Sequence, residues 1–288
     1  MQTFIEVDHF QTPKASKRIE GDAFLCRKMP TENRLITVLS DGLGSGVKAG
    51  VLSTLTATMA LTCISGNIPI ERTARIINRT LPICSERKIR YATFTIVDIS
   101  HDQEVKILEY DNPPYLLVRN GELVEIHKTT LRLPNRYRKE EGVQVSMFRA
   151  EPGDRLVFFS DGVVQSGMGT SAMPLGWGMA GVKAFVQQTI LRDPTISARE
   201  LARKVVQKSL WNDSLEAKDD VTCGVVYFRN PRKTLILTGP PFYSERDKEL
   251  GELFRTYPGK KILCGGTTAN IIARELGKKV TVQLNWLF

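Results

Sequence analysis

Histidine and cysteine are scarce in this sequence. It has three histidines and five cysteines, and no two cysteines form a C-x-x-C pair. An odd number of widely spaced cysteines is typical of reduced, buried thiols and not of a disulfide framework or a zinc site. No histidine lies in an informative motif and G-x-S-x-G is absent, which argues against a Ser–His–Asp hydrolase. We therefore expect a cytoplasmic protein without a triad of that type.

Long apolar runs and basic arms are missing as well. The start of the chain, residues 1–7, is short and carries Glu6, so it does not resemble a signal peptide. No apolar run approaches the ~20 residues that a membrane helix needs. Basic residues outnumber acidic ones by 40 to 31, a net charge of +9, but they are scattered along 288 residues. We expect neither a membrane nor a nucleic-acid partner, and nothing indicates the oligomeric state.

What the sequence does contain is a repeated strand ending. Two apolar runs end in Ser-Asp-Gly, at residues 40–42 and 160–162, and a third run, 221–228, is preceded by Asp219 and Asp220. Such runs are typical of buried strands. If the three strands bring their carboxylates together, the carboxylates repel one another unless cations are bound. The pattern predicts a divalent-metal site for phosphate chemistry.

The order of elements predicts an α+β fold. Strands outnumber helices, and the helices come in pairs, which favours two mainly antiparallel sheets packed together with helices outside. The hairpin signal Asn120-Gly121 joins two strands, and Ser197 with Glu200 forms a capping box. The glycine-rich segment 162–181 is predicted to be a mobile loop. We predict helices at 47–64, 70–84, 180–191 and 197–210, and strands at 4–7, 22–26, 35–40, 91–99, 105–110, 115–119, 123–127, 143–149, 155–160 and 221–228.

The pattern changes from Pro231 onward. Strands are predicted at 233–238, 261–264 and 280–287, and helices at 244–257 and 269–276, which together make a small α/β unit. We therefore predict two domains, 1–229 and 230–288, the second a C-terminal extension that ends inside a strand, as a truncated unit would. Residues 265–268, Gly-Gly-Thr-Thr before a helix, could bind an anion, but connecting glycines explain them better because no lysine follows.

The residue types at the strand ends suit hard cations. Two divalent ions roughly 3.5–4 Å apart can supply an ionised water and neutralise phosphate oxygens. Mg²⁺ and Mn²⁺ prefer carboxylate, carbonyl and water oxygens. Asp41 followed by the Gly42 carbonyl suits a position between two ions, Asp161 and Asp219 would complete the ligands of one ion, and Asp22 could orient bound water. Taken singly, each Ser-Asp-Gly is also explained as a turn.

These residues together resemble a known family. The ordered set is Gly21-Asp22-Ala23-Phe24, residues 40–46, Phe159-Ser160-Asp161-Gly162 and Asp219-Asp220-Val221-Thr222. It resembles the metal-dependent protein phosphatases (the PPM or protein phosphatase 2C family), in particular the bacterial branch typified by stage II sporulation protein E. Residues 112–116, Asn-Pro-Pro-Tyr-Leu, look like the Pro-Pro hairpin of that branch. The resemblance covers about residues 1–228 and implies a four-layer α-β-β-α sandwich.

The resemblance also implies an activity and roles for residues. It implies a phosphoserine/phosphothreonine phosphatase that uses two Mn²⁺ or Mg²⁺ ions and attacks its substrate directly with an activated water. Asp41 is then the bridging ligand, Gly42 a carbonyl ligand, and Asp161 and Asp219 ligands of one ion. Behind these ligands, Asp22 and Asp220 act as supporting residues. Lys17 and Arg18 lie near the place of the phosphate-binding arginine of the animal enzymes. Leu43 replaces their histidine, so the general acid is not identified.

Partners follow from the same resemblance. Members of the bacterial branch commonly act on small phosphorylated regulatory proteins, such as anti-sigma-factor antagonists. The alternative is a catalytically inactive module that keeps the fold and binds a signalling partner. A dinucleotide site after the strand 35–40 is excluded, because no acidic residue follows between Asp41 and Glu71 to bind a ribose.

Overall fold

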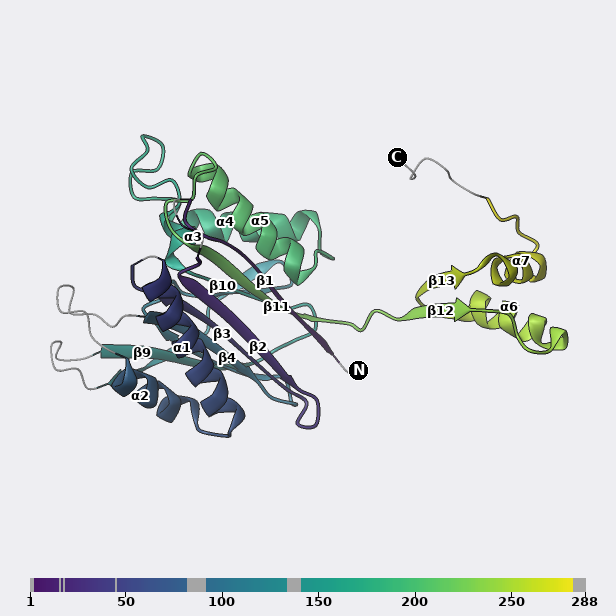
Figure 1. Ribbon diagram of the computed structural model, residues 1–288, viewed down its shortest axis with the longest axis horizontal. Helices are drawn as coiled ribbons and strands as arrows, with labels where there is room; N and C mark the ends of the chain where they lie inside the picture. The colour runs from purple at the N-terminus through teal and green to yellow at the C-terminus, as the bar shows by residue number, and fades with distance from the viewer. Residues whose placement is uncertain are drawn as a thin grey trace. The chain divides into compact units, whose positions relative to one another are not determined.

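Two antiparallel sheets form the larger unit of the protein, residues 3–229 (Figure 1). The computed structural model describes residues 3–15, 17, 19–44, 46–81, 92–133 and 141–281. The six-stranded sheet has the order β2 (Asp22–Met29), β3 (Arg34–Gly42), β4 (Ala92–Ile99), β5 (Glu104–Tyr110), β9 (Glu141–Arg149) and β8 (Lys128–Leu133). The five-stranded sheet has the order β1 (Phe4–Thr12), β11 (Val221–Arg229), β10 (Arg155–Phe159), β6 (Leu116–Arg119) and β7 (Glu122–Val124).

Helices cover the outer face of each sheet. α1 (Val47–Ser65) and α2 (Ile70–Thr80) pack on the six-stranded sheet, and α3 (Asp161–Gln165), α4 (Gly178–Arg192) and α5 (Ala198–Asn212) pack on the five-stranded one (Figure 1). The layers are therefore α-β-β-α, as predicted. Ser197 caps α5 as predicted, since the Glu200 amide donates to Ser197 Oγ at 3.2 Å, whereas the Glu200 carboxylate accepts from Arg203.

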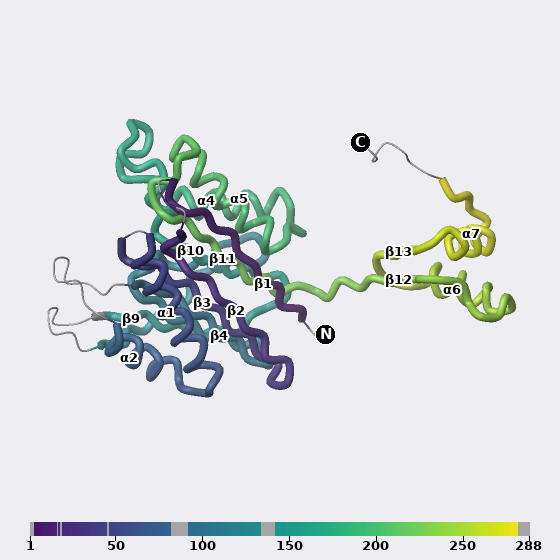
Figure 2. Tube along the Cα trace, viewed as in Figure 1, coloured from purple at the N-terminus to yellow at the C-terminus, as the bar shows by residue number. Residues whose placement is uncertain are grey.

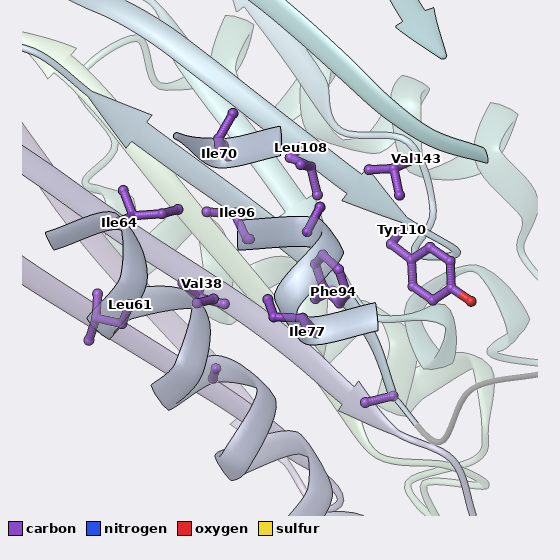
Figure 3. Packing of buried hydrophobic residues seen from close by; sticks show 14 of the residues in the cluster. Val38, Leu61, Ile64, Ile70, Ile77, Phe94, Ile96, Leu108, Tyr110 and Val143 are labelled. Atoms are coloured by element: carbon purple, nitrogen blue, oxygen red, sulfur yellow. The ribbon is translucent and has the colours of Figure 1, made fainter. Parts of the chain in front are cut away.

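β3 shows why its sequence is a continuous apolar run. Leu35 and Leu39 point to the other sheet and pack in a cluster with Phe158, whereas Ile36 and Val38 point to the helices. A strand that is buried on both faces has no polar alternation. Figure 3 shows part of the helix-side cluster, with Val38, Ile64 and Ile77 among its members. Burying side chains of this size stabilises the fold by roughly 1.5–3 kcal/mol each.

α1 is more apolar than the sequence analysis expected. Within the described part of the chain it is the one helix long and apolar enough to cross a membrane, with a hydropathy of 1.5. Serines and threonines interrupt its apolar residues, which is why no long run was evident. Ala57, Ala60 and Ile64 are fully buried against the six-stranded sheet, so α1 is a core helix of the sandwich.

The second unit, from residue 230 onward, has its own small sheet. β12 (Thr234–Thr238) and β13 (Lys260–Cys264) pair in parallel, and the chain between and after them forms the 3-10 turn η1 (Ser244–Arg246), α6 (Asp247–Thr256) and α7 (Gly266–Glu275) (Figure 2). Arg274 of α7 donates to the buried Asp247 of α6 at 2.6 Å. This ion pair joins the two helices of the unit.

Several predicted boundaries were wrong. β1 continues to Thr12 because it pairs with β11 along its whole length. β8 was missed because it is a polar strand at the edge of its sheet. The segment 162–181 is not one loop, since α3 covers its beginning and α4 its end, and α7 begins at Gly266, three residues earlier than predicted. The predicted helix end at 84 and most of the predicted strand 280–287 lie outside the described residues.

The predicted hairpin at Asn120-Gly121 is confirmed. Asn120 has φ 51° and Gly121 φ 82°, and β6 and β7 pair directly on either side of them. Two consecutive positive φ angles are those of the two-residue turn whose twist matches antiparallel strands.

Candidate active site

Four strand ends meet at one end of the sandwich. β3 and β10 end there, and β2 and β11 begin there, which follows from their antiparallel registers: Asp22 lies opposite Asp41, and Phe159 lies opposite Cys223. A hydrogen bond joins the two sheets at this place, from Thr222 Oγ1 to Asp22 Oδ2 at 2.6 Å. The sequence motifs that were far apart along the chain therefore come together.

Two glycines allow the backbone to pack tightly here. A Cβ on Gly42 would lie 2.2 Å from the Ala49 carbonyl oxygen of α1, and a Cβ on Gly162 would lie 2.2 Å from the Asp220 carbonyl oxygen. No side chain fits at such distances. The glycine of each Ser-Asp-Gly is thus required by the close approach of neighbouring backbone, and it fixes where the preceding aspartate lies.

The aspartates lie close enough to change one another's pKa. Burial raises the pKa of Asp41 well above its ordinary value, and the charges of Asp22, Asp161 and Asp219 raise it further. The Asp161 carboxyl acts directly on Asp41 and raises its pKa, whereas Asp41 acts on the pKa of Asp161 in the opposite direction. Burial raises the pKa of Asp161 and of Asp219 as well, and for Asp219 the charge of Asp161 adds to it.

Asp22 is the most enclosed of these carboxyls. Burial raises the pKa of Asp22 to about 7, although hydrogen bonds from Thr222 and Ser160 act in the opposite direction. Its Oδ1 atom is buried without a hydrogen-bond partner. A buried carboxylate oxygen without a partner is costly, and an ion or ordered water would relieve that cost.

The donor set fits a hard cation, although the side chains are not arranged around one. Carboxylate oxygens under mutual repulsion are the ligands that Mg²⁺ and Mn²⁺ prefer. Over the ranges that the structure describes, no three His, Cys, Asp or Glu side chains are placed to hold one ion. The ligand roles of Asp41, Gly42, Asp161 and Asp219 thus stay predictions.

Other residues of the sequence motifs make hydrogen bonds that support the site. Ser160 Oγ accepts from the Thr222 amide at 3.0 Å, and the Ser160 amide donates to the Thr222 carbonyl at the same distance. Asn112 of the Pro-Pro hairpin accepts from Thr93, the residue opposite Asp41 in the sheet. The motifs thus contain positioning residues that sequence reasoning did not assign.

The basic segment before β2 also reaches this end of the sandwich. The Lys14 amide donates to Asp220 Oδ1 at 3.2 Å, and the Lys14 charge lowers the pKa of Asp219. Lys17 is exposed. Its Cδ atom lies near Gly46, 3.9 Å from the position that a Cβ on that glycine would take. Arg18 lies outside the described residues. Lys14 was missed because nothing in its sequence context separates it from Lys17 and Arg18.

The metal-free protein is expected to lose stability as pH rises from about 4 to about 7. Unfolded Asp22 ionises near 3.8, but folded Asp22 keeps its proton up to about 7. The folded state then binds more protons than the unfolded state, so the free energy of unfolding falls with rising pH. Urea unfolding in EDTA across this range measures the fall. It should be smaller in Asp22→Asn, and an equal fall would place the titrating groups elsewhere.

Comparisons with known proteins identify the family and agree with the fold. The family model for stage II sporulation protein E (SpoIIE) matches residues 31–229. The phosphatase domain of SpoIIE from Bacillus subtilis superposes with a TM-score of 0.57 at 17% identity, over 84% of this chain and 96% of that one. A serine/threonine phosphatase of S. agalactiae gives 0.54 at 15% identity, over 78% and 100%. RsbX in complex with magnesium gives 0.50 at 17% identity, over 79% and 98%. No curated protein matches the sequence.

Proposed function

Because the chain belongs to the stage II sporulation protein E family, we propose that it is a metal-dependent phosphatase that removes phosphate from phosphoserine or phosphothreonine of a regulatory protein. The observation that carries this proposal is the group of carboxyls at the strand ends. There the charges of Asp22, Asp161 and Asp219 raise the pKa of Asp41. The S. agalactiae neighbour supports the serine/threonine class of substrate.

Each carboxyl has a proposed part in the site. Asp41, the Gly42 carbonyl, Asp161 and Asp219 would hold two Mn²⁺ or Mg²⁺ ions, as the magnesium complex of RsbX supports. When bound, the ions would supply an ionised water at neutral pH and neutralise the charge of the phosphate. Asp41 and Asp161 would bind the ions in their charged form, which the positive charge of the ions favours. Asp22 would accept a hydrogen bond at its unpartnered Oδ1, and Thr222 holds it in place.

The remaining residues shape the approach to the carboxyls. Asp220 is buried and anchors the basic segment through the Lys14 amide. Lys14 and Lys17 bring positive charge to this end of the sandwich, which would attract a phosphorylated side chain. We assign the phosphatase domain to residues 1–229 and treat the unit from 230 as an extension that recruits or regulates.

Removal of divalent cations is expected to abolish hydrolysis. Without them the buried carboxyls repel a phosphate instead of binding it, because they carry charge of the same sign. We expect p-nitrophenyl phosphate turnover with Mn²⁺, its loss in EDTA, and its return when Mn²⁺ is added in excess. Full turnover in EDTA would contradict the proposal. No turnover with either metal would favour a catalytically inactive partner-binding module.

A further inference from the structure

Away from the carboxyls, arginine side chains line a second pocket. Arg75, Asn78 and Arg79 come from α2, and Arg132 comes from β8, the edge strand of the six-stranded sheet. The pocket has a volume of about 310 Å³. Asn78 is buried, whereas Arg75 and Arg79 are exposed at the rim. We call this site the arginine pocket.

The arginine pocket is separate from the candidate active site. β8 lies four strand positions from β3 in the order β3-β4-β5-β9-β8. At ~4.8 Å per strand, that places β8 roughly 19 Å from β3, which ends at the candidate ligands. A group bound in the pocket is therefore not the group that the carboxyls act on, and the pocket has no place in the proposed hydrolysis.

α2 carries three arginines and only one acidic residue, Glu71, whose charge acts on both Lys106 and Arg75. Glu71, one turn before Arg75 on α2, forms an ion pair with Lys106 of β5 at 2.5 Å. Among the residues with described positions, neither Arg75 nor Arg79 forms an ion pair. Arg75, Arg79 and Arg132 place three groups of the same charge around one small cavity, and an anion bound between them would be attracted by each.

The number and type of donors favour phosphate over carboxylate. A phosphate monoester carries about two negative charges near pH 7 and offers three acceptor oxygens, whereas a carboxylate carries one charge. Guanidinium groups bind phosphate oxygens in pairs of parallel hydrogen bonds. Asn78 adds an amide at the wall of the pocket. We propose that the arginine pocket binds the phosphate group of a phosphorylated ligand.

Isothermal titration of pyrophosphate into the full-length, metal-free protein tests this proposal. EDTA keeps metal ions out of the candidate active site, and the variants below leave that site unchanged, so a loss of affinity in them reports on the arginine pocket. The double variant Arg75→Gln/Arg79→Gln should bind pyrophosphate at least about tenfold more weakly than the wild type, because it loses two charge-assisted contacts. Arg132→Gln should weaken binding from the other wall of the pocket.

The control is Arg72→Gln, which removes one positive charge from α2, as Arg132→Gln does from β8, at an exposed position that does not line the pocket. It should change the affinity less than about twofold. An equal loss in Arg72→Gln, or an unchanged affinity in the double variant, would overturn the proposal. Citrate that competes as well as pyrophosphate would overturn the choice of phosphate.

A second titration identifies the source of the phosphate. A short phosphoserine peptide that binds, while its unphosphorylated form does not, supports a phosphorylated protein as the ligand. Binding of pyrophosphate without the peptide supports a small phosphorylated molecule. Because both titrations omit metal and measure no turnover, their result does not depend on whether the protein is a phosphatase.

Discussion

Replacing Asp41 with asparagine is expected to lower kcat for p-nitrophenyl phosphate at least about 100-fold at saturating Mn²⁺. Loss of a group that merely supports a metal ligand typically costs 10–100-fold in affinity or activity. Asp41 is proposed to bridge two ions, so its loss should cost at least the upper end of that range. Asparagine keeps the shape of the side chain and removes its charge.

The same substitution is expected to stabilise the metal-free protein. Burial and three neighbouring carboxyls raise the pKa of Asp41, which means that its charged form is disfavoured in the fold. Asparagine removes that cost, so the melting temperature in EDTA near neutral pH should rise above that of the wild type. At low pH, where Asp41 of the wild type is protonated in both the folded and the unfolded state, the difference should vanish.

Asp102→Asn is the control for both measurements. Asp102 is exposed in the turn between β4 and β5, at the other end of β4 from Ala92, the residue that lies opposite Gly42. It removes one negative charge from the same sheet and should change neither kcat nor the melting temperature. If Asp41→Asn loses activity and stability together, Asp41 supports the fold and its proposed role as a ligand is wrong.

The strands that carry the site were predictable from the sequence because of how they are buried. β3 and β10 lie in the interior of their sheets, with helices on one face and the other sheet opposite, so their residues are apolar on both faces. Such a strand stands out as a continuous run, and its polar end is conspicuous. The aspartates at residues 41 and 161 were found for this reason.

Elements at the edges were less predictable. β8 has exposed threonines and a lysine at the edge of its sheet, where burial imposes no pattern. α3 has five residues, too few to show a helical period, and its glycine suggested a loop. The polar half of β1 became strand through its pairing with β11, a partner more than 200 residues away. Long-range pairing of this kind leaves no local signal.

The contacts around the carboxyls were only partly predictable. The motif letters pointed to the aspartates, but the bond from Thr222 to Asp22 joins two sheets and depends on their packing. Lys14 acts on Asp219 through space and has no motif of its own. The arginine pocket likewise combines a helix with an edge strand that the sequence did not predict.

Gly162→Ala is expected to destabilise the protein by about 3 kcal/mol, at the upper end of what overpacking in a core costs. The added Cβ would lie 2.2 Å from the Asp220 carbonyl oxygen and 3.3 Å from Val221 Cγ2. The first of these is backbone, held by the pairing of β11, so the chain has to move. Urea unfolding in EDTA measures the loss without any contribution from bound metal.

Gly66→Ala is the matched control. Gly66 ends α1 in the same unit with φ −85°, and a Cβ there would come no closer than 3.3 Å to another atom, the Thr62 carbonyl oxygen. It should change the free energy of unfolding by less than about 1 kcal/mol. Since Asp161 and Asp220 are displaced together when residue 162 gains a side chain, Gly162→Ala should also weaken Mn²⁺ binding in a titration of the folded variant. Unchanged stability and unchanged Mn²⁺ affinity would show that the chain at Gly162 is not packed against the Asp220 carbonyl. The proposed convergence of Asp161 with Asp219 would then be wrong.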